Sequence, residues 1–175
     1  MEIAALPALK MGYTVRPCTL DDVEAVVALM NACAIKTIGE ADETVEQTRS
    51  DWQRPDFDQA ASQRVVLASD RSIVGWAEVH DAEGVVIYTD VYVHPDYENE
   101  GIGEYLMAWV EARARQAVDK APDGARVVLR GYADPFIAIR KTNREYQPES
   151  WDSSPSPVLE FVTSFILKFL IQFIK

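Results

Sequence analysis

The sequence predicts an α/β protein whose sheet is mixed, mostly antiparallel and flanked by helices. Three β-branched segments follow one another between residues 64 and 94, and the connections between them are short enough to require hairpins. A glycine-containing loop, an amphipathic segment and one more apolar segment come next. A strand, helix, strand order of this kind forms a right-handed crossover, so the last strand is expected to run parallel to the one before the loop.

Length and composition point to a single globular domain. The chain has 175 residues, of which 48% are apolar and 26% charged. Its net charge of -11 argues against a nucleic-acid partner and favours cationic small molecules. Cys18 and Cys33 are too few for a disulfide framework and lack zinc-site spacing, so we expect no metal and a cytoplasmic protein. Residues 1–12 show no signal peptide and are expected to form a loose extension.

The first elements follow from local signals. "YTVRPC" alternates as a short strand does, and Thr19 with Asp22 can cap the helix that follows. That helix has an apolar stripe, formed by Val23, Val26, Val27, Met30 and Ala34. A second helix in "DETVEQTRSDWQR" must stop before Pro55, because proline removes a donor and disfavours helical geometry in the residue before it.

The second half of the core reads as a meander followed by a crossover. The three expected strands are "RVVLAS", "SIVGWAEVH" and "VVIYTDVYVH". A helix from about Gly103 to Lys120 places its apolar residues on one face, namely Leu106, Trp109, Val110 and Ala114. "ARVVLRGY" is the expected parallel strand.

The loop "VHPDYENEGIGEYL" carries the chemical signal. Two glycines between a strand and a helix are typical of a phosphate-binding turn, yet four carboxylates lie in and around this loop: Asp96, Glu98, Glu100 and Glu104. The dinucleotide fingerprint fails because Leu106 occupies its third glycine position, and no GK[ST] follows as a P-loop requires.

The same loop resembles the central motif of the GNAT superfamily of acetyl-CoA-dependent N-acetyltransferases, roughly V-x-P-x-[YF]-[RQ]-x-x-G-x-[GA]-x-x-L. The matching residues are Val93, Pro95, Tyr97, Gly101, Gly103 and Leu106. The order of elements from about residue 13 to 132 is similar too, which implies a GNAT-like acyl-CoA-binding core with acetyl-CoA as acyl donor. Glu98 departs from the motif, because the family prefers Arg or Gln there, and its charge is expected to weaken phosphate binding without abolishing it.

The resemblance implies where the coenzyme would lie. Backbone N–H groups at the helix start would hold the pyrophosphate, and the pantetheine arm would pair with free backbone groups in a gap beside the strand before the loop. The implied coenzyme-binding residues are Val91, Val93, Glu98, Asn99, Gly101, Ile102, Gly103 and Glu104. For Glu104, stabilisation of the helix dipole is an equally good explanation.

The candidate catalytic residues are Asp90, Glu78 and Tyr146. Either carboxylate could take the proton of an ammonium group, although a carboxylate on a strand is more often solvated or bonded structurally. Tyr146 is a weak stand-in for the family's tyrosine that protonates the thiolate.

The chain departs from the family after Ala133. Residues 133–157 read as an irregular segment and linker, and residues 158–175 as an amphipathic C-terminal helix with a broad apolar face. Four interpretations of that helix compete: it covers the sheet, it mediates self-association, it contacts a membrane, or it is an aberrant extension of a truncated chain. Coverage of the sheet is the plainest of these, and self-association comes next. Membrane contact is disfavoured, because the longest uninterrupted apolar run is three residues and an interfacial helix is usually more basic.

The sequence thus predicts an N-acetyltransferase that acts on a small-molecule or peptide amine. A catalytically silent GNAT-like CoA-binding or interaction module is the alternative. The acceptor has no readable signature in the sequence.

Overall fold

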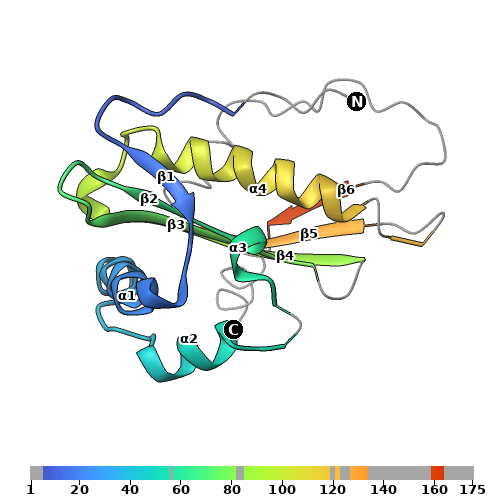
Figure 1. The fold of residues 1–175 in the computed structure, drawn as a ribbon, viewed down its shortest axis with the longest axis horizontal. Helices are drawn as coiled ribbons and strands as arrows, with labels where there is room; N and C mark the ends of the chain where they lie inside the picture. Colours follow the sequence, from blue (N-terminus) through green and yellow to red (C-terminus); the bar gives the residue numbers. More distant parts are fainter. Residues whose placement is uncertain are drawn as a thin grey trace, which may run out of the picture.

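The computed structural model describes residues 6–55, 57–81, 85–118, 121–122, 127–133 and 159–163, and these form one six-stranded sheet in which the strands lie in chain order (Figure 1). The strands are β1 (Thr14–Pro17), β2 (Gln63–Leu67), β3 (Ile73–His80), β4 (Val86–Val93), β5 (Val127–Ala133) and β6 (Leu159–Thr163). Neighbours from β1 to β4 are antiparallel, whereas β4–β5 and β5–β6 are parallel. The predicted mixed, mostly antiparallel sheet is confirmed.

Helices cover both faces of this sheet. They are η1 (Leu20–Asp22), α1 (Val23–Ile38), α2 (Val45–Trp52), α3 (Gln59–Ser62), η2 (Pro95–Tyr97) and α4 (Ile102–Val118). In Figure 1, α4 lies on one face, and α1 and α2 lie on the other. Two buried clusters match these layers, one centred on α4 and one on α1. The apolar stripes predicted for both helices face these clusters.

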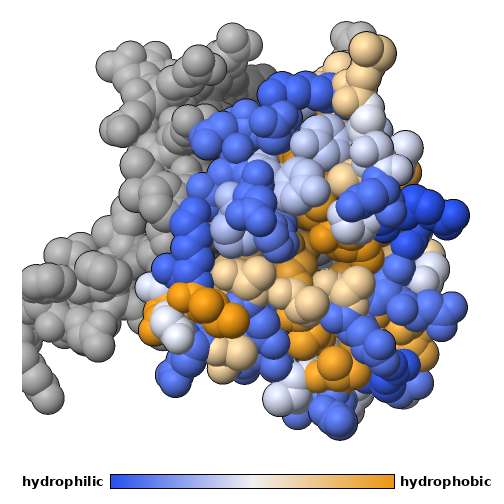
Figure 2. Space-filling model, turned by 90° about the vertical axis from the view of Figure 1, so that its left-hand side faces the viewer, coloured by the Kyte–Doolittle hydropathy of each residue, from blue (hydrophilic) through white to orange (hydrophobic). Residues whose placement is uncertain are grey.

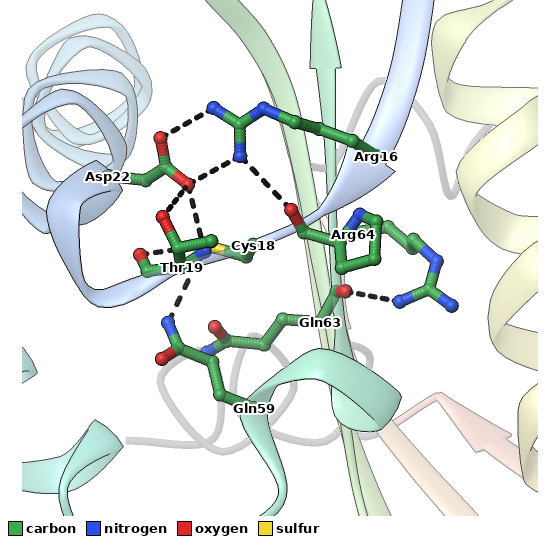
Figure 3. Close-up of polar contacts among 8 residues, drawn as sticks. Arg16, Cys18, Thr19, Asp22, Gln59, Gln63 and Arg64 are labelled. Carbon is green, nitrogen blue, oxygen red and sulfur yellow. Dashed lines mark hydrogen bonds and ion pairs between the residues drawn. The ribbon is translucent and has the colours of Figure 1, made fainter.

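A charged network fixes the start of α1 (Figure 3). The Asp22 carboxylate accepts hydrogen bonds from the Thr19 backbone N–H at 2.8 Å and from the Thr19 hydroxyl at 2.9 Å. Arg16 on β1 donates both Nη atoms to the same carboxylate, at 2.6 and 2.7 Å. The Arg16 guanidinium lowers the pKa of Asp22, so this predicted capping pair stays ionised and also ties α1 to the sheet.

A β-bulge between β2 and β3 sets the register of the sheet. Val66 pairs with Gly75 but Leu67 pairs with Ile73, which leaves Val74 as the extra residue on β3. If the pairing continued from Leu67–Ile73 without a bulge, Gln63 would lie opposite Ala77. The bulge instead places Gln63 opposite Glu78, on the face that α1 and α2 cover.

The side of the molecule that carries α1 has a mostly polar surface. Figure 2 shows hydrophilic residues over much of the described surface there, with apolar residues in smaller groups between them. Within the described ranges, no helix is both long and apolar enough to cross a membrane.

Two expectations about the chain ends need correction. The segment before β1 is not loose at Leu9 and Lys10, because Leu9 packs against the α4-side core and Lys10 pairs with Glu100. The helix expected from residue 158 is wrong at its start, where residues 159–163 form β6 beside β5. A free edge of β5 offers unpaired N–H and C=O groups, a tertiary effect that helical periodicity does not report. Residues 164–175, the rest of that expected helix, lie outside the described part, as do residues 134–158.

Gly75 lets α4 approach the sheet. A Cβ built at this position would lie 2.6 Å from Ile102 Cγ2 and 3.1 Å from Leu106 Cδ1. Both atoms belong to fully buried side chains in the first turns of α4. Any larger residue on β3 would therefore push away the start of α4 and the loop before it.

We expect Gly75→Ala to lower the free energy of unfolding by about 1–3 kcal/mol, because the added methyl group overpacks this contact. Chemical denaturation followed by tryptophan fluorescence measures the change. Arg71→Gly is the matched control on the β2–β3 turn, where the arginine already has a φ of 70° and glycine fits without strain. A Gly75→Ala protein as stable as this control would contradict the close packing.

Candidate functional site

The loop between β4 and α4 presents backbone N–H groups. Asn99 and Gly101 have φ values of 69° and 85°, both in the left-handed region. The Gly101 carbonyl accepts from the Tyr105 N–H at 3.1 Å, which starts α4. The N–H groups of the first turn, at residues 102–104, have no acceptor within their own helix and mark a place for an anion.

The two glycines of the motif do different things. Gly101 has a positive φ, whereas Gly103 lies within α4 and is not among the residues with positive φ. Gly103 is buried, as is its neighbour Ile102, whereas Glu104 and Asn99 are exposed. Left-handed geometry at Asn99 was not part of the sequence prediction, although asparagine tolerates it better than most residues.

Lysines from two distant segments neutralise the acidic loop. Glu98 Oε1 lies 2.5 Å from Lys36 Nζ on α1, and Glu100 Oε2 lies 2.7 Å from Lys10 Nζ in the segment before β1. The unfavourable charge expected of Glu98 is therefore offset by a cation 62 residues away in the chain. Such half-exposed pairs add little stability, but they offset the charges of Glu98 and Glu100, two of the four carboxylates in and around the loop.

The strand gap expected beside Val91 is not present at that residue. β4 pairs with β5 from Val86–Val128 up to Val91–Ala133. Among the described residues, which end at Ala133 on this side of β4, Tyr92 and Val93 lie past the last pair. Any opening between the two strands therefore begins one residue later than the resemblance implies, at the end of β4 that leads into the loop.

Glu78 and Asp90 lie directly opposite each other on β3 and β4. Directly opposed residues of an antiparallel pair face the same side and have Cβ atoms about 5 Å apart. Gln63 on β2 pairs with Glu78 in register, and its Nε2 donates to Glu78 Oε2 at 2.6 Å. The structure thus brings the two predicted carboxylates together, on the sheet face that α1 and α2 cover.

Burial raises the pKa of both carboxyl groups. For Asp90 the pKa rises to about 7, chiefly through burial and then through the negative charges of Glu78 and Glu43. The pKa of Glu78 rises less clearly, because the hydrogen bond from Gln63 favours its ionised form. In this coupled pair, Asp90 is the group that holds a proton up to near-neutral pH.

Unpartnered polar atoms surround this pair. Within the described residues, three buried side-chain atoms have no hydrogen-bond partner, and they are Gln63 Oε1, Trp76 Nε1 and His80 Nε2. Trp76 and His80 are two residues from Glu78 on β3 and therefore share its face. Buried polar groups without partners are rare in proteins, so their gathering here indicates a place for a ligand.

Aromatic rings form one wall of the same region. The Trp76 ring is stacked near Trp52 of α2, with centroids 6.2 Å apart, and lies 6.0 Å from Tyr92 of β4. Burial, followed by the charge of Asp90, raises the pKa of Tyr92, so its phenol stays protonated.

The sequence analysis did not identify Trp76, Tyr92 or Gln63 as residues of this region. Alternation along β3 and β4 would have placed Trp76 and Tyr92 beside the two carboxylates, so that signal was available. No sequence signal predicts Gln63, because its position depends on the bulge.

Tyr146 lies outside the described residues, and its role stays a prediction. Within the described part, no group of three or more His, Cys, Asp or Glu residues could hold a metal ion.

The raised pKa of Asp90 predicts a pH-dependent stability. Below pH 3.8 the carboxyl is neutral in both the folded and the unfolded chain, whereas between pH 4 and 7 only the unfolded chain readily ionises it. The wild type therefore loses stability across this window. We expect the gain in unfolding free energy from Asp90→Asn to grow by about 2 kcal/mol from pH 4 to pH 7 and then level off. Denaturation at several pH values measures it.

Asp21→Asn is the control for this pH series, because Asp21 is exposed and its side chain forms no hydrogen bond or ion pair among the described residues. Its effect on unfolding should change little across the same range. A gain from Asp90→Asn that is equal at pH 4 and pH 8 would show that the folded protein ionises Asp90 as readily as the unfolded chain does.

Comparisons with known proteins agree with this geometry. The family model for the acetyltransferase (GNAT) family matches residues 24–123. A crystal structure of a GCN5-related N-acetyltransferase from Sphaerobacter thermophilus is 26% identical with a TM-score of 0.69 and covers 78% of this chain, but the chain spans only 44% of that protein.

A second structure, from Salmonella typhimurium, was solved with its cofactor acetyl-CoA. Its sequence is 18% identical to this chain and the TM-score is 0.55. The match covers 75% of this chain and 77% of the Salmonella protein. No curated protein sequence gives a significant match. The family model covers more than half of the chain, and the order of strands and the loop before α4 fit it, so this protein belongs to the GNAT acetyltransferase family.

Proposed function

We propose that this protein transfers the acetyl group of acetyl-CoA to a primary amine of a small molecule or peptide. The observation that carries the proposal is the placement of Asp90. Its carboxyl, with a pKa near 7, lies on the strand that ends in the anion-binding loop. A short segment of β4 therefore connects the proposed general base to the helix N-terminus that would bind the phosphates.

The coenzyme would bind across the loop and the end of β4. First-turn N–H groups of α4 would hold the pyrophosphate, with Gly101 allowing close approach. Lys36 and Lys10 would keep the loop carboxylates neutralised. The backbone at Tyr92 and Val93, beyond the last β5 pair, would receive the pantetheine arm.

Acetyl transfer needs few groups beyond these. The ionised Asp90 carboxylate takes a proton from the acceptor ammonium, and the amine nitrogen then attacks the thioester carbonyl carbon. A backbone N–H near the end of β4 stabilises the oxyanion, and the carbon–sulfur bond breaks as the carbonyl re-forms. The leaving thiolate takes a proton from Tyr146, the candidate from sequence, and the second proton of the attacking nitrogen, which the product amide must lose, passes to that phenolate. Glu78 raises the pKa of Asp90 and so acts through it.

A catalytically silent CoA-binding module remains the second candidate. The observation that favours it is the unbroken pairing of β4 with β5 up to Val91, which narrows the room for the pantetheine arm. The two candidates differ in the release of free thiol from acetyl-CoA when an amine is present. Transfer predicts amine-dependent thiol release, whereas a silent module binds the coenzyme without it.

Asp90→Asn should lower kcat/KM for amine acetylation by at least about 100-fold, because the base that accepts the ammonium proton is lost. Its Kd for acetyl-CoA, measured by calorimetry, should stay within about twofold of wild type. Glu78→Gln is the companion variant, and it should move the acidic limb of the kcat/KM profile to lower pH, because a like charge that raises the pKa of Asp90 is gone. Full activity in Asp90→Asn would exclude this base.

Gly101→Val should weaken acetyl-CoA binding by at least about tenfold, because a branched side chain both strains the left-handed backbone and blocks the loop N–H groups. Gly39→Val provides the control for strain alone. Gly39 ends α1 with a φ of 89°, and a Cβ there, as at Gly101, meets no atom within 4 Å. Calorimetric titration with acetyl-CoA measures the Kd of both variants. Equal affinities of Gly101→Val and Gly39→Val would show that the coenzyme binds elsewhere.

A further inference from the structure

We propose that the acceptor is a basic amine that carries a second positive charge and no anionic group. This inference rests on the proposed acetyl transfer and names the substrate class of the same site. It comes from the charges and unpartnered atoms on the face that α1 and α2 cover, where the acceptor would meet Asp90.

Carboxylates from four elements converge on that face. Glu78 and Asp90 come from β3 and β4, and Asp51 comes from α2. Glu43 and its neighbour Asp42 come from the connection between α1 and α2. These carboxylates act on one another: after burial, the charges of Glu78 and Glu43 raise the pKa of Asp90, and those of Asp42 and Asp51 raise the pKa of Glu43.

Little positive charge balances this group. None of the five carboxylates forms an ion pair within the ranges that the structure describes. Arg54 and His80 are the cationic or potentially cationic groups that act on Glu78, and both lower its pKa only after the larger effects of burial and Gln63. The guanidinium of Arg54 is exposed and lies over the Phe57 ring, 5.8 Å from its centroid.

An unsatisfied acceptor points independently to a missing donor. Gln63 is 0% exposed, and while its Nε2 binds Glu78, its Oε1 has no partner among the described residues. Both atoms belong to one planar amide, so Oε1 is bonded to the same carbon as the nitrogen that binds Glu78. A ligand ammonium, with three N–H groups, satisfies this oxygen and the carboxylate together. A carboxylate or phosphate on the ligand would offer no hydrogen-bond donor to Gln63 Oε1 or to the Glu78 carboxylate.

The aromatic wall fits the rest of such a ligand. Trp76, Trp52 and Tyr92 form an apolar cluster beside the acidic group, and Tyr92 is its partly buried member, against which a short methylene chain can pack. Ring faces also attract ammonium groups. An acceptor with two ammonium groups joined by methylenes can therefore place one nitrogen at Asp90 and the other near Glu43.

Three amines of matched length test this inference on the full chain: 1,4-diaminobutane, butylamine and 4-aminobutanoate. Thiol release from acetyl-CoA gives kcat/KM for each, and calorimetry without coenzyme gives each Kd. We expect 1,4-diaminobutane to exceed butylamine by at least about tenfold in both measurements, and 4-aminobutanoate to rank last. The preference should shrink as salt rises from 50 to 500 mM, because screening weakens charge recognition.

Glu43→Gln should reduce the preference for the diamine over butylamine by several-fold. Glu46→Gln, an exposed acid on α2 that does not act on this group, is the matched control and should keep the ratio. Equal use of the three amines, or a preference for 4-aminobutanoate, overturns the inference while leaving acetyl transfer intact. If no amine releases thiol, the proposed function fails, and the calorimetric ranking alone then decides whether this face selects basic amines.

Discussion

The pairing of β3 with β4 is the constraint on which the rest of the structure depends. One continuous register holds Glu78 opposite Asp90 on one face and Gly75 opposite Val93 near the loop. A slip of β3 by one residue would move Glu78 to the face that α4 covers, where the core is apolar, and would replace Gly75 by a residue with a side chain under Ile102. A slip of β4 would move Asp90 to that face in the same way. The packing of α4, the loop geometry and the acidic pair therefore share one cause.

The two faces of the sheet carry different kinds of side chain. On the α4 face, apolar packing fixes the helix start, so that its free N–H groups can hold an anion without cations in the motif itself. The lysines that neutralise the loop come from α1 and from the segment before β1, which places them beside the loop only in the folded chain. On the opposite face, carboxylates that form no ion pair in the described part of the chain lie together in a half-buried setting, and there their like charges raise one another's pKa values.

In the function that we propose, this division would let one strand serve both substrates. Asp90 of β4 faces the acidic side of the sheet, and the C-terminal end of β4 leads into the loop before α4. The acceptor would meet the acidic face, and the phosphates of the coenzyme would meet the N–H groups at the start of α4. This placement would keep the phosphates away from the carboxylates, whose charges would otherwise weaken coenzyme binding.

The sequence by itself determined the element order, the faces of α1 and α4, and the loop with Gly101, because these depend on local periodicity, capping and backbone torsion. It also named Asp90 and Glu78 as candidates, since both lie on strands predicted by alternation. Only the tertiary structure decided that Gln63 faces Glu78, because a single bulge at Val74 shifts the register. The same holds for the partners of Glu98 and Glu100, which lie 62 and 90 residues away. It holds as well for β6, where a free strand edge prevailed over helical periodicity. Long-range pairings like these have no local signature, because they arise only when distant segments meet.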